Sequence, residues 1–103
     1  MVLLSVYITA GSEREAERIT KRLLEKRLVA CVNFLPAKSS YWWKGKLVNA
    51  KEVVLVAKTR KGNWEKIRSE VKKAHSYSVP CITAHEVKAG KDYEEWVLGE
   101  TKT

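Results

Sequence analysis

Apolar and polar positions in the first quarter of the chain follow two periods, one of a strand and one of a helix. Residues 2–9 form an apolar, β-branched run that ends at an Ala-Gly pair, which predicts a central strand. Ser12 and Glu15 have the spacing of a capping box, and alanine, isoleucine and leucine then recur at helical spacing. The pattern predicts a helix that starts after Ser12 and ends near Arg27.

The middle of the chain has the pattern of a long hairpin. Residues 29–32 restore strand character, Pro36 interrupts it, and residues 40–43 resume it before a turn at residues 44–46. Residues 51–60 form an apolar run that predicts a return strand buried on both faces. We therefore expect one long bent strand, a turn and a return strand.

The second half of the chain predicts a helix, a strand and a short final helix. Gly62 and Asn63 are expected to start the first of these helices. Its apolar stripe consists of Trp64, Ile67, Val71 and Ala74. Residues 81–87 form the last expected strand. Asp92 with Glu95 predicts the cap of a closing helix, and Gly99 weakens the end of that helix.

This order of elements, βαββαβ followed by a helix, is that of an α+β ferredoxin-like sandwich with an antiparallel sheet. Its usual strand order, 4-1-3-2, makes the second and fourth strands the edges. Neighbouring residues on a strand alternate faces, so Tyr41, Trp42 and Trp43 cannot all point inward. We expect a single domain over residues 1–103 whose edge strands pair with other copies in an oligomer.

Charge is unevenly distributed along the sequence. The 103 residues carry 20 lysines plus arginines against 12 acidic residues, a formal net charge of +8, and residues 38–61 alone contribute +6. A basic segment of this kind fits three interpretations: nucleic-acid binding, contact with an anionic metabolite or acidic protein, or a solvated strand edge protected from aggregation.

Composition sets the expected environment of the chain. No apolar run approaches the ~20 residues that a membrane-spanning helix needs, so we expect no membrane contact. Cys31 and Cys81 are the two cysteines, and their spacing suggests neither a zinc ribbon nor a disulfide framework, which favours the cytoplasm. The chain has no glutamine and one aspartate but many lysines and glutamates, as thermostable proteins often do.

The segment from His75 to Pro80 contains the residues best suited to ligand chemistry. It places an imidazole and the Tyr77 phenol on a loop at a sheet end. The alternative is that His75 closes the preceding helix, where the helix dipole favours a cationic ring. Cys31 is a candidate ligand for a soft ion such as copper, although a lone cysteine is usually a small buried hydrophobe.

Four other residues with reactive or charged side chains give weaker indications of a binding site. Cys81 and His85 share a strand face but lie ~13 Å apart, too far for one metal ion. Lys58 and Glu52 could bind an anion and a cation, or pair with each other or solvent.

Motifs argue against an enzyme and against nucleic acid. No dinucleotide, P-loop, nucleophile-elbow or zincin motif occurs, and we expect a non-enzymatic protein. An RNA-recognition domain shares the element order and would stack bases on Tyr7 and on aromatic residues of the third strand. Because residues 51–58 contain no aromatic ring, we do not expect nucleic acid to bind.

Several segments together resemble the CutA, or divalent-ion tolerance, proteins from about Leu3 to Glu100. The matching pieces are residues 27–33, 41–47 and 52–59, His75 with Tyr77, Val79-Pro80, and Tyr93 with Trp96. The resemblance implies a homotrimer with an architecture like that of PII-type signalling proteins, and a role in tolerance of copper and other divalent metals.

The resemblance also implies a ligand or metal site in clefts between subunits. The candidate metal ligands are His75 and Cys31, and the candidate cleft residues are Tyr41, Trp43, Glu52, Lys58, His75, Tyr77 and Pro80. Four positions depart from the family pattern. Ser76 replaces a proline and Ser78 an acidic or polar residue, while Ile8 and Ala74 stand where copper-binding relatives carry a thiol and a second histidine.

The predicted function is that of a CutA-like homotrimer in divalent-metal tolerance, with copper or another divalent ion bound at subunit clefts. The alternative is a PII-like regulator whose basic hairpin binds a small anionic metabolite or an acidic protein.

Overall fold

The computed structural model describes residues 2–102 and contains the elements that the pattern predicts, in the predicted order. The strands are β1 (Leu3–Ala10), β2 (Cys31–Trp43), β3 (Lys46–Arg60) and β4 (Ile82–Val87). The helices are α1 (Glu13–Glu25), α2 (Trp64–Ala74) and α3 (Lys91–Glu100), with a short 3-10 turn at Lys61–Asn63. All strand pairs are antiparallel in the order β2-β3-β1-β4, so the predicted sheet and its two edges are confirmed.

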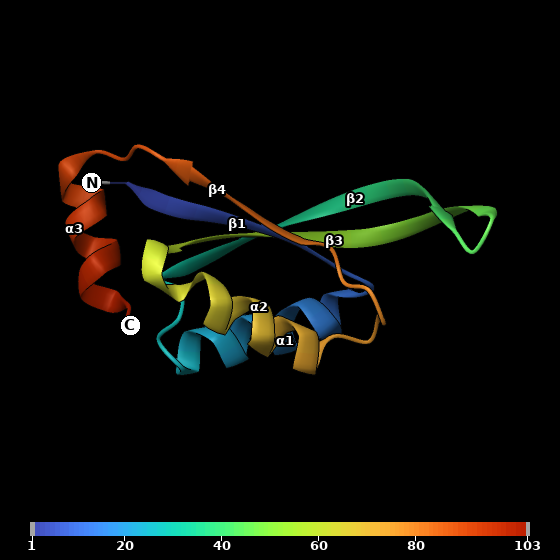
Figure 1. The fold of residues 1–103 in the computed structure, drawn as a ribbon, viewed down its shortest axis with the longest axis horizontal. Coiled ribbons are helices and arrows are strands. Elements are labelled where there is room, and N and C mark those ends of the chain that lie inside the picture. The colour runs from blue at the N-terminus through green and yellow to red at the C-terminus, as the bar shows by residue number, and fades with distance from the viewer. Residues whose placement is uncertain (1, 103) are drawn as a thin grey trace.

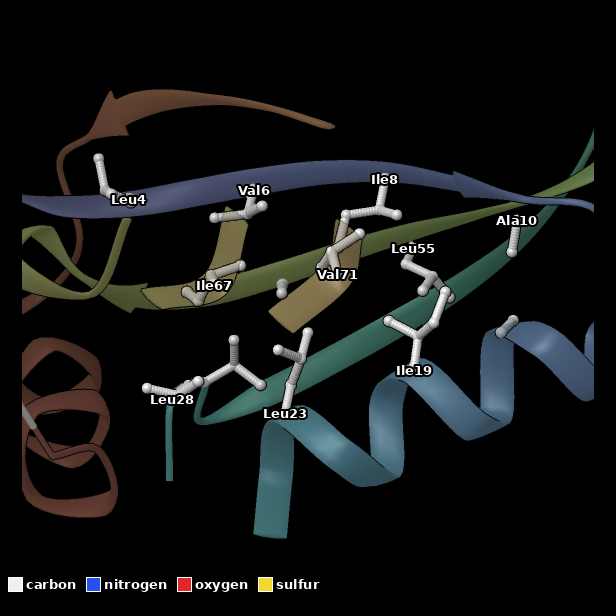
Figure 2. Close-up of a cluster of buried hydrophobic side chains, with 13 residues drawn as sticks. Leu4, Val6, Ile8, Ala10, Ile19, Leu23, Leu28, Leu55, Ile67 and Val71 are labelled. Carbon is white, nitrogen blue, oxygen red and sulfur yellow. The ribbon is translucent and has the colours of Figure 1, made fainter. Parts of the chain in front are cut away.

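The helices α1 and α2 lie side by side on one face of the sheet, and α3 lies at the end where β1 begins (Figure 1). Figure 2 shows buried side chains from β1, β3, α1 and α2 gathered between the sheet and the two helices. This cluster includes Val6, Ile8, Leu55, Ile19, Leu23, Ile67 and Val71. Each buried side chain of this size contributes about 1.5–3 kcal/mol to stability, which makes the helix-covered face the main core.

The opposite face of the sheet is open except at the end covered by α3. Arg60 on β3 holds the end of α3 against the sheet. Its guanidinium donates hydrogen bonds to the carbonyls of Leu98 and Thr101 and to the Thr101 hydroxyl. Tyr7, which points to the open face, is exposed. The open face is therefore the surface on which a ligand or another subunit can rest.

The hairpin of β2 and β3 extends past the helices (Figure 1), which makes the chain 44 Å long against 23 and 21 Å in its other dimensions. We call residues 38–51 of this hairpin the arm. A two-residue turn closes it, with Lys44 and Gly45 both at positive φ (49° and 79°), as a type I′ turn requires. Trp42 on the arm is 72% exposed, as the alternation argument required of at least one of its three aromatic residues.

Two local predictions, on Pro36 and Asp92, need correction. Pro36 does not interrupt β2, because the strand lies at the sheet edge, where a proline need not donate a ladder hydrogen bond. The predicted start of α2 is confirmed, because Asn63 holds the N-cap position; its side chain makes no cap hydrogen bond, and its buried amide donates instead to the Leu28 carbonyl and the Thr59 hydroxyl. Asp92 does not cap α3, because Gly90 occupies the N-cap position and makes no side-chain cap.

Candidate functional site

The loop from His75 to Pro80 joins α2 to β4, and its first residues pack against the end of β1 and the start of α1. The His75 side chain is fully buried: its Nε2 donates to the Thr9 carbonyl at 2.6 Å, and its Nδ1 accepts from the Tyr77 backbone N–H at 3.1 Å. His75 is the C-cap residue of α2, as the alternative interpretation expected, and neither of its ring nitrogens is free for a metal ion within the chain.

Glu15 holds the start of the same loop from α1. Its carboxylate, only 4% exposed, accepts hydrogen bonds from the Gly11 N–H at 2.9 Å, from the Ser76 N–H at 2.7 Å and from Arg18 at 3.2 Å. Burial alone would raise the pKa of Glu15, but the hydrogen bonds from Gly11 and Ser76 and the nearby His75 outweigh it and lower the pKa below 4.5. The Ser12 hydroxyl accepts from the Glu15 N–H, so half of the predicted capping box forms.

Tyr77 joins the loop to β3. Its hydroxyl donates to the Glu52 carboxylate at 2.9 Å, and Glu52 is 8% exposed. Burial and the hydrogen bond to Glu52 raise the pKa of Tyr77 to about 12, so the phenol stays protonated as a donor. Gly11 makes room for this ring, because a Cβ atom at Gly11 would lie 3.1 Å from the Tyr77 hydroxyl oxygen.

A cleft of about 810 Å³ opens on the free face of the sheet beside this pair. It brings together four of the predicted cleft residues: Tyr41, Trp43, Glu52 and Tyr77. Its other lining residues include Tyr7, Thr9, Ser78 and Cys81, which the sequence did not assign to a cleft. Tyr7 is the one exposed residue of β1, and the sequence signal that could have found it is the alternation that places it on the same strand face as Ser5 and Thr9.

Three predicted cleft residues do not line this cleft within one chain. His75 lies behind Tyr77, with the two ring centroids 4.7 Å apart. Pro80 is also absent from the lining. In the sheet, Lys58 lies opposite Ser5 of β1 and Cys31 of β2, near the end covered by α3. The cleft borders Thr9, which lies opposite Val54, and Val54 is four residues away from Lys58 along β3. A site that combines them needs more than one subunit and stays a prediction.

The candidate metal ligands are also separated. Cys31 lies at that same far end, with its sulfur 3.1 Å from the Tyr93 hydroxyl, and burial together with Cys31 raises the pKa of Tyr93 to about 12. The four strand residues that separate Lys58 from Val54 span ~13 Å, so Cys31 and His75 cannot share one ion within a chain. Among residues 2–102, no three His, Cys, Asp or Glu side chains are grouped to hold a metal.

The arm carries much of the positive charge. Lys38 and Lys51 lie directly opposite each other across β2 and β3, and the Lys44 ammonium lies 5.7 Å from the ring centroid of Trp43. Within the described chain, the arm lysines make no ion pair. The arm therefore presents unneutralised charge to its surroundings.

None of the helices described between residues 2 and 102 has the length and apolarity needed to cross a membrane.

Comparison with known proteins identifies a consistent set of relatives. The family model described as CutA1 divalent ion tolerance protein matches residues 4–100. A protein of Archaeoglobus fulgidus named divalent-cation tolerance protein CutA is 50% identical over 93 residues, which cover 89% of this chain and 91% of that protein.

Two solved structures extend the likeness to three dimensions. The structure described as the periplasmic divalent cation tolerance protein CutA from Archaeoglobus fulgidus is 49% identical, with a TM-score of 0.89 over 92% of this chain and 94% of that chain. CutA1 from Pyrococcus horikoshii is 38% identical, with a TM-score of 0.93 over 97% and 99%.

Proposed function

Because the chain belongs to the CutA1 divalent ion tolerance protein family, we propose that it acts in divalent-cation tolerance as a homotrimer and without catalysing a reaction. The observation that carries this proposal is the match over residues 4–100, which includes the core, the arm and the loop from His75 to Pro80. The relatives are named for tolerance of divalent cations, and none of the names cited above describes an enzyme.

Surface chemistry supports the assembly of copies. The edge strands β2 and β4 have one unpaired side each within the chain, and the arm exposes Trp42 and Leu47, which lie opposite each other. Exposed apolar side chains on a long edge strand are unfavourable in a lone subunit and favour pairing with another copy.

Light scattering tests the trimer directly. Three 11.8 kDa chains have a mass of about 35 kDa, and we expect this mass at micromolar concentration. Trp42→Glu should shift the mass towards 11.8 kDa, while Trp96→Glu on α3 serves as a control of equal charge change. A lone protomer for the unmodified chain would contradict the proposal.

Metal binding within one subunit does not fit the residues present, because His75 uses both ring nitrogens and Cys31 lies at the other end of the sheet. We therefore propose that any divalent ion draws its ligands from more than one subunit. Calorimetric titration with Cu²⁺ should give heat with the trimer and none with Trp42→Glu. Equal heat from both proteins would contradict this.

Growth tests the tolerance function. In a bacterial host that lacks its own relative, the chain should allow growth at higher Cu²⁺ concentrations than Trp42→Glu present in equal amount. Identical growth curves would count against the role. Cell fractionation would test the expected cytoplasmic location, which stays a proposal.

The comparisons do not favour the alternative of a PII-like regulator, since the relatives are named for cation tolerance.

We also propose, from the composition of the sequence, that the protein is thermostable. Thermal unfolding of the trimer tests this.

A further inference from the structure

Two charged side chains on the open face of the sheet lack a counter-charge within the chain. Glu52 is 8% exposed, and its carboxylate receives one hydrogen bond, from the neutral Tyr77 hydroxyl. Lys58 is partly buried on the same strand, β3. Neither side chain makes an ion pair among residues 2–102. Because a charge removed from water attracts its opposite more strongly, both groups are suited to a partner from outside the chain.

Strand geometry places these two charges on one face but far apart. Lys58 lies opposite Ser5 of β1, which shares the open face with Tyr7. Glu52 lines the cleft on this face together with Tyr7. Glu52 and Lys58 are six residues apart along the strand, which corresponds to ~20 Å. An ion pair needs its nitrogen and oxygen within about 4 Å, so the two charges cannot pair within one chain.

Between the two charges the open face is apolar. Val54 and Val56 lie between them on β3, with Leu35 of β2 opposite Val54 and Tyr7 of β1 opposite Val56. Leu35 is 50% exposed and Tyr7 is 40% exposed. An exposed apolar patch of this kind favours contact with another protein surface. A partner that fits must present a cation to Glu52, an anion to Lys58 and an apolar surface between them.

A second copy of this chain meets all three requirements, because it carries the same anion, the same cation and the same apolar stretch. The arm continues this surface, and its exposed Trp42 and Leu47 also favour contact between copies. We propose that in the homotrimer Glu52 of each subunit forms an ion pair with Lys58 of the neighbouring subunit.

The inference rests on the proposed homotrimer and names a contact that holds it together. Each subunit in a ring of three presents one surface to one neighbour and a different surface to the other. Glu52 of each subunit can therefore meet Lys58 of the next, which gives one pair at each interface. Lys58 suits this role better than Lys46 at the end of the arm, because Lys46 is exposed and keeps its water.

Loss of one partner should weaken assembly more than loss of both. A buried charge whose partner is removed stays uncompensated, whereas removal of both charges leaves no charge to bury. Glu52→Gln keeps an acceptor for the Tyr77 hydroxyl, and Lys58→Gln keeps a polar side chain of similar length. The effects of these two substitutions on assembly should therefore not be additive.

Dilution followed by light scattering measures the concentration at which the trimer dissociates. We expect Glu52→Gln and Lys58→Gln each to raise this concentration about tenfold or more. The double variant should dissociate at no higher concentration than the weaker of the two single variants. Single variants that behave like the unmodified chain, or effects that add in the double variant, would overturn the proposal.

Three further variants separate the ion pair from net charge and folding. Lys46→Gln and Glu95→Gln make the same charge changes at exposed positions and should leave the dissociation concentration within about threefold of the unmodified chain. Lys58→Arg keeps the charge and should stay in the same range. If Glu52→Gln does not fold, the Lys58 variants decide. Equal dissociation of Lys58→Gln with Lys46→Gln, or with Lys58→Arg, then overturns the proposal.

The same measurements distinguish this inference from the proposed function. A trimer of the unmodified chain whose dissociation does not respond to Glu52→Gln and Lys58→Gln rejects the ion pair and leaves the homotrimer intact. A lone protomer of the unmodified chain rejects both.

Discussion

Single buried side chains hold the loop from His75 to Pro80 against three different elements. His75 bonds to β1, Glu15 reaches the loop from α1, and Tyr77 bonds to Glu52 on β3. Each of these groups is polar and largely removed from water, so the loss of one partner leaves another unsatisfied. The loop position is therefore sensitive to single substitutions.

Tyr77→Phe removes the donor to a buried carboxylate. Hydrogen bonds to charged groups contribute about 1.5–3 kcal/mol, and we expect the free energy of unfolding to fall by about that amount. Tyr93→Phe is the matched control, because its partner is the neutral Cys31 thiol and its expected loss is about 0.5–1.5 kcal/mol. Urea unfolding at one protein concentration measures both. A smaller loss for Tyr77→Phe than for Tyr93→Phe would disprove the assignment.

The ionisation of Glu15 makes the free energy of unfolding depend on pH. Its pKa lies below 4.5 in the folded chain, so the unfolded chain binds the proton more readily. The stabilisation that Glu15 contributes is present above about pH 4.5 and is lost as pH falls through the folded pKa. The variant Glu15→Gln has no ionisable side chain at this position, so it lacks this pH-dependent stabilisation. Unfolding free energies of both proteins between pH 7 and pH 3 should therefore converge below pH 4.5, and parallel curves would refute the prediction.

Among the secondary-structure elements, the hairpin of β2 and β3 depends on the shape of its turn. Gly45 has φ of 79°, and a Cβ added there would meet nothing within 4 Å. Gly99 in α3 has equally open surroundings but a helical backbone. The two glycines therefore separate backbone conformation from packing.

Alanine at these two positions should have opposite effects. Gly45→Ala places a side chain in the left-handed region and should destabilise the chain by about 1 kcal/mol. Gly99→Ala should stabilise it by about 0.5 kcal/mol, because alanine loses less entropy in a helix. Thermal unfolding measures both, and the same sign for the two variants would contradict the explanation.

For the assembled protein, net charge opposes association. Each chain carries +8, so a trimer would carry 3 × 8 = +24, and the arm lysines make no ion pair within the described chain. Salt reduces repulsion between exposed charges, because the screening distance falls to a few ångströms at high ionic strength. Assembly should accordingly depend on salt.

Dilution experiments in low and high salt measure this dependence. We expect the trimer to dissociate at lower protein concentration in about 0.5 M salt than in about 0.02 M salt, as judged by light scattering. The double variant Lys38→Glu, Lys51→Glu lowers the chain charge from +8 to +4 and should be less sensitive to salt. Dissociation that increases with salt in the unmodified chain would be inconsistent with charge repulsion.

Prediction from the sequence succeeded where local pattern and short-range geometry decide the outcome. The apolar, β-branched run of residues 2–9 and the helical spacing after Ser12 located β1 and α1, and the element order predicted the strand order 4-1-3-2. The end of α2 at Ala74 also agrees with the sequence. Pro36 was misjudged because a proline is tolerated in β2 only through the position of that strand at the sheet edge, and the hydrogen bond from Asn63 to the distant Leu28 carbonyl could not be predicted from local pattern.

The site depended on contacts between residues far apart in the chain. Tyr41, Trp43, Glu52 and Tyr77 were named as cleft residues from the family resemblance, and they do line one cleft. Nothing in the sequence indicated that His75 would be buried with both ring nitrogens bonded, or that Lys58 would lie beside Cys31.

Hydrophobic periodicity and turn residues were sufficient to specify the elements and their order, because each strand and helix must bury one side and the short connections leave few arrangements. The charge and accessibility of the cleft emerged from packing. The loop after α2 folds back onto β1 and β3, which removes His75 from water and leaves Glu52 with a neutral partner. Such contacts depend on the three-dimensional position of the backbone, which no local pattern records.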